Sequence, residues 1–177
     1  MEFELLGDDR AGPALSLDHE QFAYAGKFVM SGPKALAREG DSVVGAISFS
    51  EDHSDPGAVR LRYVTVREDR RGEGIGPRLL RFTAARLTDR YDDILIAANN
   101  PIAYEACYRA GFVFTGEETG IAELLMRYQP GEREGDRYRE GFAVFREREL
   151  PAPHEAVCRR HADGEPPPVV ADPAGGL

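Results

Sequence analysis

A glycine-rich loop joins a β-rich segment to an amphipathic helix, and a second apolar segment follows that helix. The segment AVRLRYVTV (58–66) is rich in β-branched residues and favours a strand, and the glycines of the loop at 71–76 come soon after it. From Pro77 to about Arg90, apolar residues recur on one helical face. The run DDILIAA (92–98) is typical of a strand that is covered on both sides. This succession predicts an α/β fold.

The flanking segments complete a mixed sheet. Residues 101–110 form a predicted helix, because Asn100 is suited to its N-cap, Pro101 to its first position and Gly111 to its end. The remaining expectations are strands at 2–6, 34–39 and 42–51, a short helix or irregular arm at 17–26, and two strands within 112–128 around a turn from Gly116 to Gly120. We expect 42–51 to pair antiparallel with 58–66. The predicted fold is therefore a central mixed β-sheet flanked by helices.

The composition changes after residue 128. Residues 129–162 are charged, with a small apolar patch at 142–145 and a short predicted helix near 153–162. Residues 163–177 are rich in proline, glycine and acidic residues, which predicts disorder. We therefore expect one folded domain at 1–128, a charged C-terminal extension at 129–162 and a disordered tail at 163–177.

Charge and composition narrow the classes of function. A net charge of −9 and an isoelectric point near 5.0 argue against a nucleic-acid partner and favour cationic ones. No apolar run is long enough to span a bilayer, and the acidic N-terminus does not resemble a secretory signal. The two cysteines, Cys107 and Cys158, suit a reducing compartment, so we expect a soluble, cytoplasmic protein. The acidic, arginine-rich composition fits a halophile, although a GC-rich genome gives the same arginine bias.

The glycine loop predicts an anion site. Glycine loses the most backbone freedom on folding, so a loop this poor in side chains indicates that a ligand comes close to the main chain. Its N–H groups and the positive end of the following helix converge on one place. A dinucleotide-binding loop would need glycine where Pro77 stands, and a P-loop would need Gly-Lys-Ser/Thr, which is absent. The alternative is a structural turn without a ligand.

The stretch VREDRRGEGIGPRLL, followed by Asn100, Ala103 and the Gly111-Phe112 pair, resembles the GNAT superfamily of acyl-CoA-dependent N-acetyltransferases. The resemblance covers most of 1–128 and is strongest from Tyr63 to Phe112. It implies that main-chain N–H groups hold the coenzyme A pyrophosphate; these belong to Arg71, Gly72, Glu73, Gly74, Ile75 and Gly76. It also implies that the main chain from Val64 to Val66 binds the pantetheine arm and orients the thioester carbonyl.

The same resemblance implies acetyl transfer from acetyl-CoA to a primary amine, by direct attack in a ternary complex without a metal. The acceptor is either a small amine or a protein N-terminus, and we expect its pocket to be built from 17–34 and 116–122. The sequence leaves open whether the protein forms a homodimer. The alternative function is a sensor or structural subunit that binds acyl-CoA without turnover.

The proton donor to the leaving sulfur has two candidates. The family usually places a tyrosine four residues before the Gly-Phe pair, where this chain has Cys107, and Tyr108 is the next residue. Successive helical side chains point about 100° apart, so the two cannot both face the same sulfur. Tyr108 is the preferred acid, and Cys107 is the alternative. Asn100 is expected near the pantetheine as well as at the N-cap.

The general base is less well defined by the sequence. Glu123 is the first choice, because a carboxylate inside an apolar strand would have a raised pKa. The other carboxylates considered are Glu51, Asp52, Glu117 and Glu118. His154, Cys158 and His161 have helical spacing that suits metal ligands, but such a set in a charged tail is more often accidental, and no metal is expected.

Overall fold

The computed structural model describes residues 1–8, 10–131, 133–173 and 175. The chain divides into two compact units, Met1–Ile94 with Ala171–Leu177 and Leu95–Val170. The strands follow the order β1-β2-β3-β4-β5-β7-β6 in a seven-stranded sheet. Strand β5 begins at the end of the first unit and continues into the second. The predicted α/β fold with a mixed sheet and flanking helices is therefore confirmed.

Four antiparallel neighbours form the sheet of the first unit. They are β1 (Glu2–Leu6), β2 (Lys34–Glu39), β3 (Ser42–Glu51) and β4 (Ala58–Val66). The predicted antiparallel pairing of β3 with β4 is confirmed. Its register shifts between Ser48 and Phe49, because Ser48 pairs with Tyr63 and Phe49 with Leu61. Arg62 is thus the extra residue of a β-bulge, which locally interrupts the ladder.

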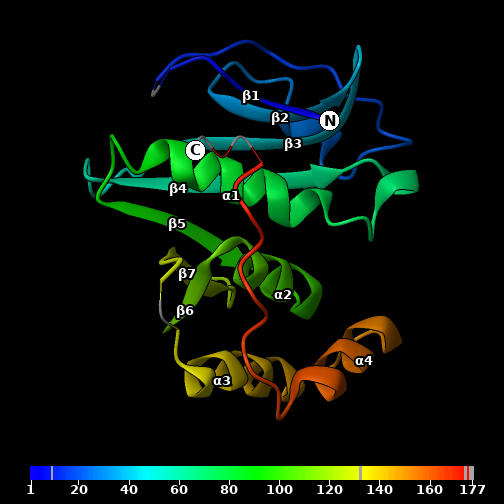
Figure 1. Cartoon of the computed structure of the whole chain (residues 1–177), viewed down its shortest axis with the longest axis vertical. Helices are drawn as coiled ribbons and strands as arrows, with labels where there is room; N and C mark the ends of the chain where they lie inside the picture. Colours follow the sequence, from blue (N-terminus) through cyan, green and yellow to red (C-terminus); the bar gives the residue numbers. More distant parts are fainter. Residues whose placement is uncertain (9, 132, 174, 176–177) are drawn as a thin grey trace. The chain divides into compact units, whose positions relative to one another are not determined.

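Helix α1 (Ile75–Leu87) lies along the strands of the first unit, as Figure 1 shows. It packs closely on β3, where a Cβ added to Gly45 would lie 3.3 Å from side-chain atoms of both Ile75 and Leu79. The helix begins two residues before the predicted start at Pro77 and ends at Leu87 rather than near Arg90. Proline is tolerated throughout the first helical turn, where N–H groups have no intrahelical partner, so Pro77 did not mark the first residue.

The irregular segment 17–33, called the arm below, precedes β2 and covers the other face of the sheet. It contains the 3-10 turn η1 (Ala25–Lys27), so the expectation of an irregular arm is correct and the alternative, a short helix over 17–26, is not. Phe28 of the arm forms a buried cluster with Leu36 and Ala46. Because side chains alternate along a strand and Gly45 faces α1, Ala46 faces away from α1 toward the arm. The arm is also joined to the turn after β4, since the Glu68 N–H donates to the Gln21 carbonyl at 2.8 Å.

The second unit combines helices with an antiparallel set of strands. Its elements are β5 (Asp93–Ala98), α2 (Pro101–Ala110), β6 (Phe112–Glu118), β7 (Leu124–Tyr128), α3 (Gly135–Arg146) and α4 (Ala152–His161). Strand β7 is antiparallel to both β5 and β6. The predicted bounds of α2 are confirmed. The turn between β6 and β7 is later than expected, because β6 continues through Gly116 to Glu118.

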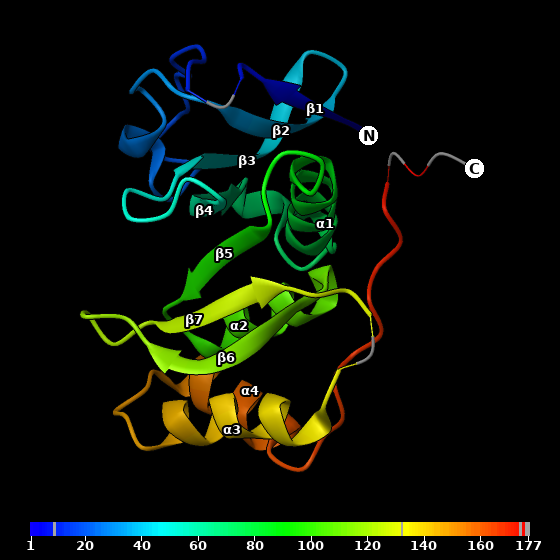
Figure 2. The same cartoon turned by 90° about the vertical axis from the view of Figure 1, so that its left-hand side faces the viewer.

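An aromatic core holds the second unit together. Helix α3, which the sequence analysis did not predict, lies along β6 (Figure 2) and buries Tyr138, Phe142 and Phe145. The ring of Tyr104 in α2 meets this set, with its centroid 4.9 Å from that of Phe142. A Cβ at Gly141 would lie 2.1 Å from the Tyr104 hydroxyl, so only glycine lets α3 approach this closely.

The segment after α4 extends along the second unit. The Val170 N–H donates to the Arg109 carbonyl at 2.8 Å, and Arg139 forms an ion pair with Glu165 at 2.8 Å. Residues 174, 176 and 177 lie outside the described part of the chain. The division into 1–128, 129–162 and a disordered 163–177 stays a prediction. Among the described residues, no helix has both the length and the apolar character needed to cross a membrane.

Candidate functional site

The loop between β4 and α1 presents a row of free main-chain N–H groups. After a 3-10 turn, η2 (Glu68–Arg70), Gly72 and Gly74 have φ angles of 85° and 75°. This left-handed conformation favours glycine, which explains the two glycines at these positions. Among the described residues, the N–H groups from Gly72 to Gly76 have no hydrogen-bond partner. A helix N-terminus with such groups suits an anion.

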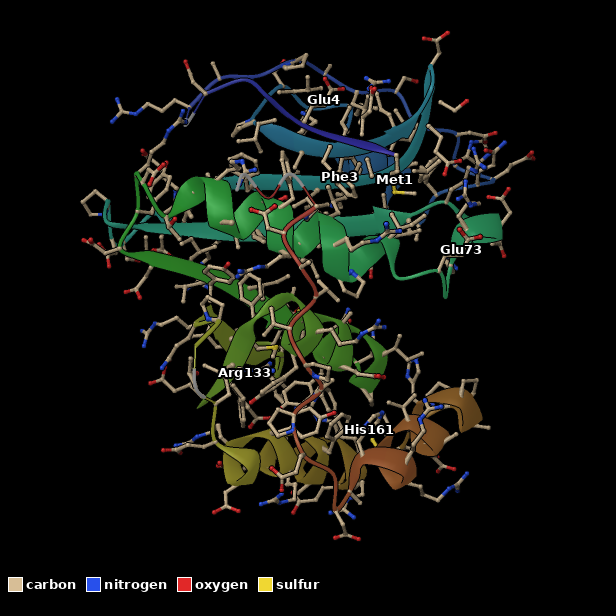
Figure 3. All side chains as sticks on the ribbon, in the orientation of Figure 1. Met1, Phe3, Glu4, Glu73, Arg133 and His161 are labelled. Atoms are coloured by element: carbon tan, nitrogen blue, oxygen red, sulfur yellow. The ribbon has the colours of Figure 1, made fainter. Side chains whose placement is uncertain are left out.

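Open space lies beside this loop. A Cβ placed on Gly72 would have no heavy atom within 4 Å, so no side chain among the described residues fills the bend at that point. Figure 3 labels Glu73 on the loop, where its carboxylate accepts from the Nε of Arg70 at 2.8 Å. Arg70 also pairs with Glu39 of β2 at 2.5 Å. These ion pairs hold the loop against β2, and hydrogen bonds from Arg70 lower the pKa of Glu39.

Two arginines beside the loop remain available to an anion. The Arg71 Nε lies 3.4 Å from the Val66 carbonyl, and the Arg78 Nε donates to the Gly74 carbonyl at 3.2 Å. Neither guanidinium has a carboxylate within ion-pair distance among the described residues. Because a guanidinium presents several donors in a fixed plane, both could add charge-assisted hydrogen bonds to a phosphate at this place.

The main chain expected to bind the pantetheine follows the bulge directly. Val64 pairs with Ile47 and Val66 with Gly45, so both lie within the regular part of the β3–β4 ladder. Both side chains are half-buried. The bulge residue Arg62 donates from Nε to the Ser50 hydroxyl at 3.0 Å. The thioester position implied by the family resemblance therefore lies next to the point where the ladder is interrupted.

A cavity of about 680 Å³ opens at this bulge. Its walls come from the arm, the start of β2, and the strands β3 and β4 of the first unit, and they include Lys27, Lys34, Glu51, Arg62 and Tyr63. Some of its arm residues fall within 17–34, where the acceptor pocket is expected, whereas 116–122 belong to the second unit. The position of the acceptor stays a prediction. The sequence analysis singled out none of Lys27, Lys34 and Arg62 as site residues, although the range 17–34 contains both lysines. Their one signal was that 27 and 34 are the only lysines of the chain.

Carboxylates of β3 and the following turn line the same cavity. Asp52 forms an ion pair with Arg60, and hydrogen bonds from Arg60 and the Ser54 N–H lower the Asp52 pKa to about 2. Asp52 is therefore a poor proton acceptor at neutral pH. Glu51 accepts from the Tyr91 hydroxyl at 3.3 Å and lies 3.7 Å from the Arg10 Nε.

Asn100 occupies the N-cap of α2, as predicted. Its Oδ1 accepts from the Ala103 N–H at 2.9 Å, and its Nδ2 donates to the Asn99 side chain at 2.8 Å. The amide therefore satisfies one of the free donors at the start of the helix. Its contact with the pantetheine stays a prediction.

Cys107 and Tyr108 are both buried in the second unit. The Tyr108 hydroxyl accepts from the Phe114 N–H at 3.0 Å, and its ring centroid lies 4.6 Å from that of Tyr138. Burial raises the pKa of Tyr108, and it raises the pKa of Cys107 to about 12. Both groups therefore stay protonated at neutral pH, as a general acid must.

Glu123 does not lie within a strand. It stands in the turn before β7, where its N–H donates to the Thr119 hydroxyl at 3.1 Å. The premise that selected it, a carboxylate inside an apolar strand, is wrong, because strand pairing begins one residue later at Leu124. Ile121 in this turn is 79% exposed, whereas Leu124, the first residue of β7, is buried. The role of Glu123 as base stays a prediction.

Three side chains have the helical spacing of metal ligands, although no metal was expected there: His154, Cys158 and His161. Cys158 is buried, and the Nδ1 atom of His161, labelled in Figure 3, lies 3.0 Å from the Tyr138 hydroxyl. In the described part of the chain, no group of three His, Cys, Asp or Glu side chains could hold a metal ion.

The comparison with known families gives the class of this protein. The sequence profile of the acetyltransferase (GNAT) family matches residues 5–112. Because this match covers more than half of the 177 residues, the chain belongs to the acetyltransferase (GNAT) family. The resemblance drawn from the glycine loop and the Gly111-Phe112 pair is thus confirmed.

Solved structures give similar matches at low sequence identity. An acetyltransferase from Thermus thermophilus is 24% identical over 53% of this chain and 60% of that chain, with a TM-score of 0.45. A Bacillus subtilis acetyltransferase in complex with CoA is 18% identical over 55% and 76%, with a TM-score of 0.47. An N-acetyltransferase from Staphylococcus aureus is 20% identical over 54% and 65%, with a TM-score of 0.44. The chain spans less than two thirds of the first and third of these structures. A search of curated proteins found no match.

Proposed function

We propose that this protein transfers the acetyl group of acetyl-CoA to a primary amine, by direct attack in a ternary complex. The observation that carries the proposal is the row of partnerless N–H groups from Gly72 to Gly76 at the start of α1. These groups would bind the pyrophosphate of coenzyme A, with Arg71 and Arg78 beside them. The proposal is supported by membership of the acetyltransferase (GNAT) family.

The proposed reaction has one tetrahedral intermediate. The amine nitrogen attacks the thioester carbon, a C–N bond forms, and the carbonyl oxygen gains the negative charge. Main-chain N–H groups near Val64 to Val66 would stabilise this oxyanion, at a typical value of about 2.7–4 kcal/mol per donor. The C–S bond then breaks, and its electron pair leaves with the sulfur, which takes a proton from the general acid.

Protonation of the leaving sulfur is assigned to Tyr108, with Cys107 as the alternative. Tyr108 remains protonated because of burial, and its hydroxyl uses an acceptor position, not its proton, in the bond with the Phe114 N–H. Asn100 is proposed to contact the pantetheine. Of the carboxylates considered as base, we favour Glu51, because it lines the cavity at the bulge and Asp52 does not suit the role.

The acceptor is proposed to be a small amine or a protein N-terminus that enters the cavity at the bulge. The experiment combines mass spectrometry of the purified chain with acetyl-CoA and an assay of thiol release over a panel of amines. We expect a complex with acetyl-CoA and thiol release that requires an amine, with acetylated amine as the product. A chain that is folded but neither binds acetyl-CoA nor releases thiol would refute the proposal.

A second candidate is a sensor or structural subunit that binds acyl-CoA without turnover. The observation that favours it is Cys107, which stands where the family usually has a tyrosine and is 2% exposed. The same assay separates the candidates, because a pure binder forms the complex with acetyl-CoA but gives no amine-dependent thiol release.

A further inference from the structure

The cavity at the β4 bulge is positively charged, although the chain as a whole carries a net charge of −9. Both lysines of the sequence, Lys27 and Lys34, line this one cavity together with Arg62. Within the described residues, none of these three cations has a carboxylate within ion-pair distance, because the ion pairs involve other residues. The overall charge, which favoured cationic partners, therefore does not describe this site.

The Lys34 ammonium carries its charge into the interior. Its side chain is 1% exposed, and Nζ donates to the carbonyls of Pro13, Met30 and Gly32 at 2.6, 2.8 and 2.9 Å. These bonds satisfy the donors but do not cancel the charge, and burial lowers the Lys34 pKa. The ammonium therefore adds positive potential behind the wall of the cavity.

Lys27 and Arg62 are exposed and can reach a ligand directly. The Lys27 Nζ lies 5.5 Å from the centre of the Tyr63 ring, and Arg62 uses its Nε on the Ser50 hydroxyl at 3.0 Å. The remaining guanidinium donors of Arg62 have no partner among the described residues. The hydroxyls of Ser31, Ser48 and Ser50 add further donors on the same lining.

The carboxylates on the cavity lining are Glu51 and Asp52, and they lie together at the end of β3, each near an arginine. Asp52 is paired with Arg60, and Arg10 lies 3.7 Å from Glu51. Glu51 stands at the end of β3, whereas Lys27 comes from the arm and Arg62 from β4. The lining thus offers one carboxylate for a cationic or reacting amine and separate cations for an anion.

We infer that the acceptor is a small amine that also carries an anionic group, a carboxylate or a phosphate, which Lys27 and Arg62 bind. This inference rests on the proposed function and names its substrate class. A cavity of about 680 Å³ has the size of an ordinary small-molecule site, which favours a small acceptor over a protein N-terminus.

The test compares amines that differ only in the anionic group. Glycine, β-alanine and γ-aminobutyrate are each assayed with acetyl-CoA beside their carboxamides, and phosphoethanolamine beside ethanolamine. Because hydrogen bonds between charged groups are strong, we expect kcat/KM for the preferred acid to exceed that of its neutral partner by about tenfold to a hundredfold. If the carboxylic acids show this difference in kcat/KM, the bound anion is a carboxylate; if phosphoethanolamine shows it, the bound anion is a phosphate. Equal or faster acetylation of the neutral partners, or acceptance of neutral peptides alone, would overturn the inference.

Charge variants give the second measurement. In Lys27→Gln and Arg62→Gln, we expect the ratio of kcat/KM between acid and carboxamide to fall about tenfold. Lys27→Arg keeps the positive charge and should therefore retain most of the wild-type ratio. Arg38→Gln, which removes a charge from a pair with Glu4 outside the cavity, is the control and should not change the ratio. An unchanged ratio in both cavity variants would contradict the inference.

Binding without turnover separates this inference from the proposed function. Calorimetry of the acids and their neutral partners, with no acetyl-CoA present, reports the anion site alone. Preferential binding of an acid that is lost in Lys27→Gln supports the inference even if no amine is acetylated, in which case the proposed function fails by itself. Thiol release without any preference for an acid leaves the proposed function intact and refutes the inference.

Discussion

The hydroxyl of Tyr108 in α2 accepts a hydrogen bond from the main-chain N–H of Phe114 in β6 at 3.0 Å. This bond links the end of the helix to the strand that follows Gly111, and both residues are buried. Tyr108 therefore has a structural function in the second unit whatever its part in catalysis. Its substitution must be judged by stability and by rate together.

Tyr108→Phe removes this hydrogen bond and leaves a buried N–H without a partner. We expect the free energy of unfolding to fall by about 1–3 kcal/mol. If Tyr108 is the acid, kcat falls by about a hundredfold or more in the folded variant, whereas Cys107→Ala changes kcat by only a few-fold. Denaturant unfolding and steady-state kinetics on the two variants check this. Unchanged kcat in Tyr108→Phe with loss of kcat in Cys107→Ala would transfer the role to Cys107.

Glu51→Gln removes the carboxylate proposed as base from the cavity. We expect kcat to fall by about a hundredfold and the rate to recover as pH rises, because a larger fraction of the free amine then reacts without help from the protein. The measurement is a pH–rate profile of the variant and the wild type. Glu147→Gln, which removes an exposed carboxylate of the second unit that is not a candidate base, is the control and should leave the profile unchanged. A wild-type profile in Glu51→Gln would show that another group takes the proton.

Asp52 makes the stability of the first unit sensitive to acid. Hydrogen bonds from Arg60 and the Ser54 N–H lower its pKa from 3.8 to about 2. A lowered carboxyl pKa adds stability that is complete above the unfolded pKa and is lost as pH falls toward 2. Because solvent screens this pair, we expect about 0.5–1 kcal/mol. Unfolding curves at pH 7, 4 and 2 should show Asp52→Asn less stable at pH 7 and equal to wild type near pH 2. A constant difference across this range would exclude the pair as the cause.

Gly141 sets the distance between α3 and α2. An added Cβ would lie 2.1 Å from the Tyr104 hydroxyl and 2.2 Å from the adjoining ring carbon, and both helices would have to move. We expect Gly141→Ala to lower the free energy of unfolding by about 1–3 kcal/mol. Gly120→Ala is the matched control, since nothing lies within 4 Å of its Cβ position. Equal stability of the two variants would show that α3 does not pack as described.

The sequence predicted the elements whose signals are local. The bounds of α2 follow from Asn100, Pro101 and Gly111, which act through hydrogen bonds and backbone angles within a few residues. Pro77 was misleading, because proline is allowed at more than one position of a first turn and Gly74 marks the boundary instead. Helix α3 was missed because its charged residues obscure a narrow apolar face, which is stabilised by packing on β6, α2 and α4.

The candidate site was predictable only in part, because only some of its residues are neighbours in the sequence. The loop from Arg71 to Gly76 is continuous in sequence, so its chemistry could be inferred from residue types. The cavity depends on the arm folding over β3 and β4, which brings together Lys27, Lys34 and Arg62 from separate segments. No local pattern encodes that arrangement. Glu123 does not lie inside a strand, because it stands between the β-turn that Thr119 and Ala122 close and the first residue of β7.

The central claim is that the N–H groups ahead of α1 bind the diphosphate of coenzyme A. Its most direct test is calorimetric titration of acetyl-CoA into the wild type, Gly72→Val and Gly40→Val. Both glycines have positive φ, 85° and 55°, and open space at Cβ, so both substitutions strain the backbone, but Gly40 lies in the β2–β3 turn. The account predicts binding that weakens by at least about tenfold in Gly72→Val and is kept in Gly40→Val. Absence of binding by the folded wild type, or equal affinity in all three proteins, would contradict it.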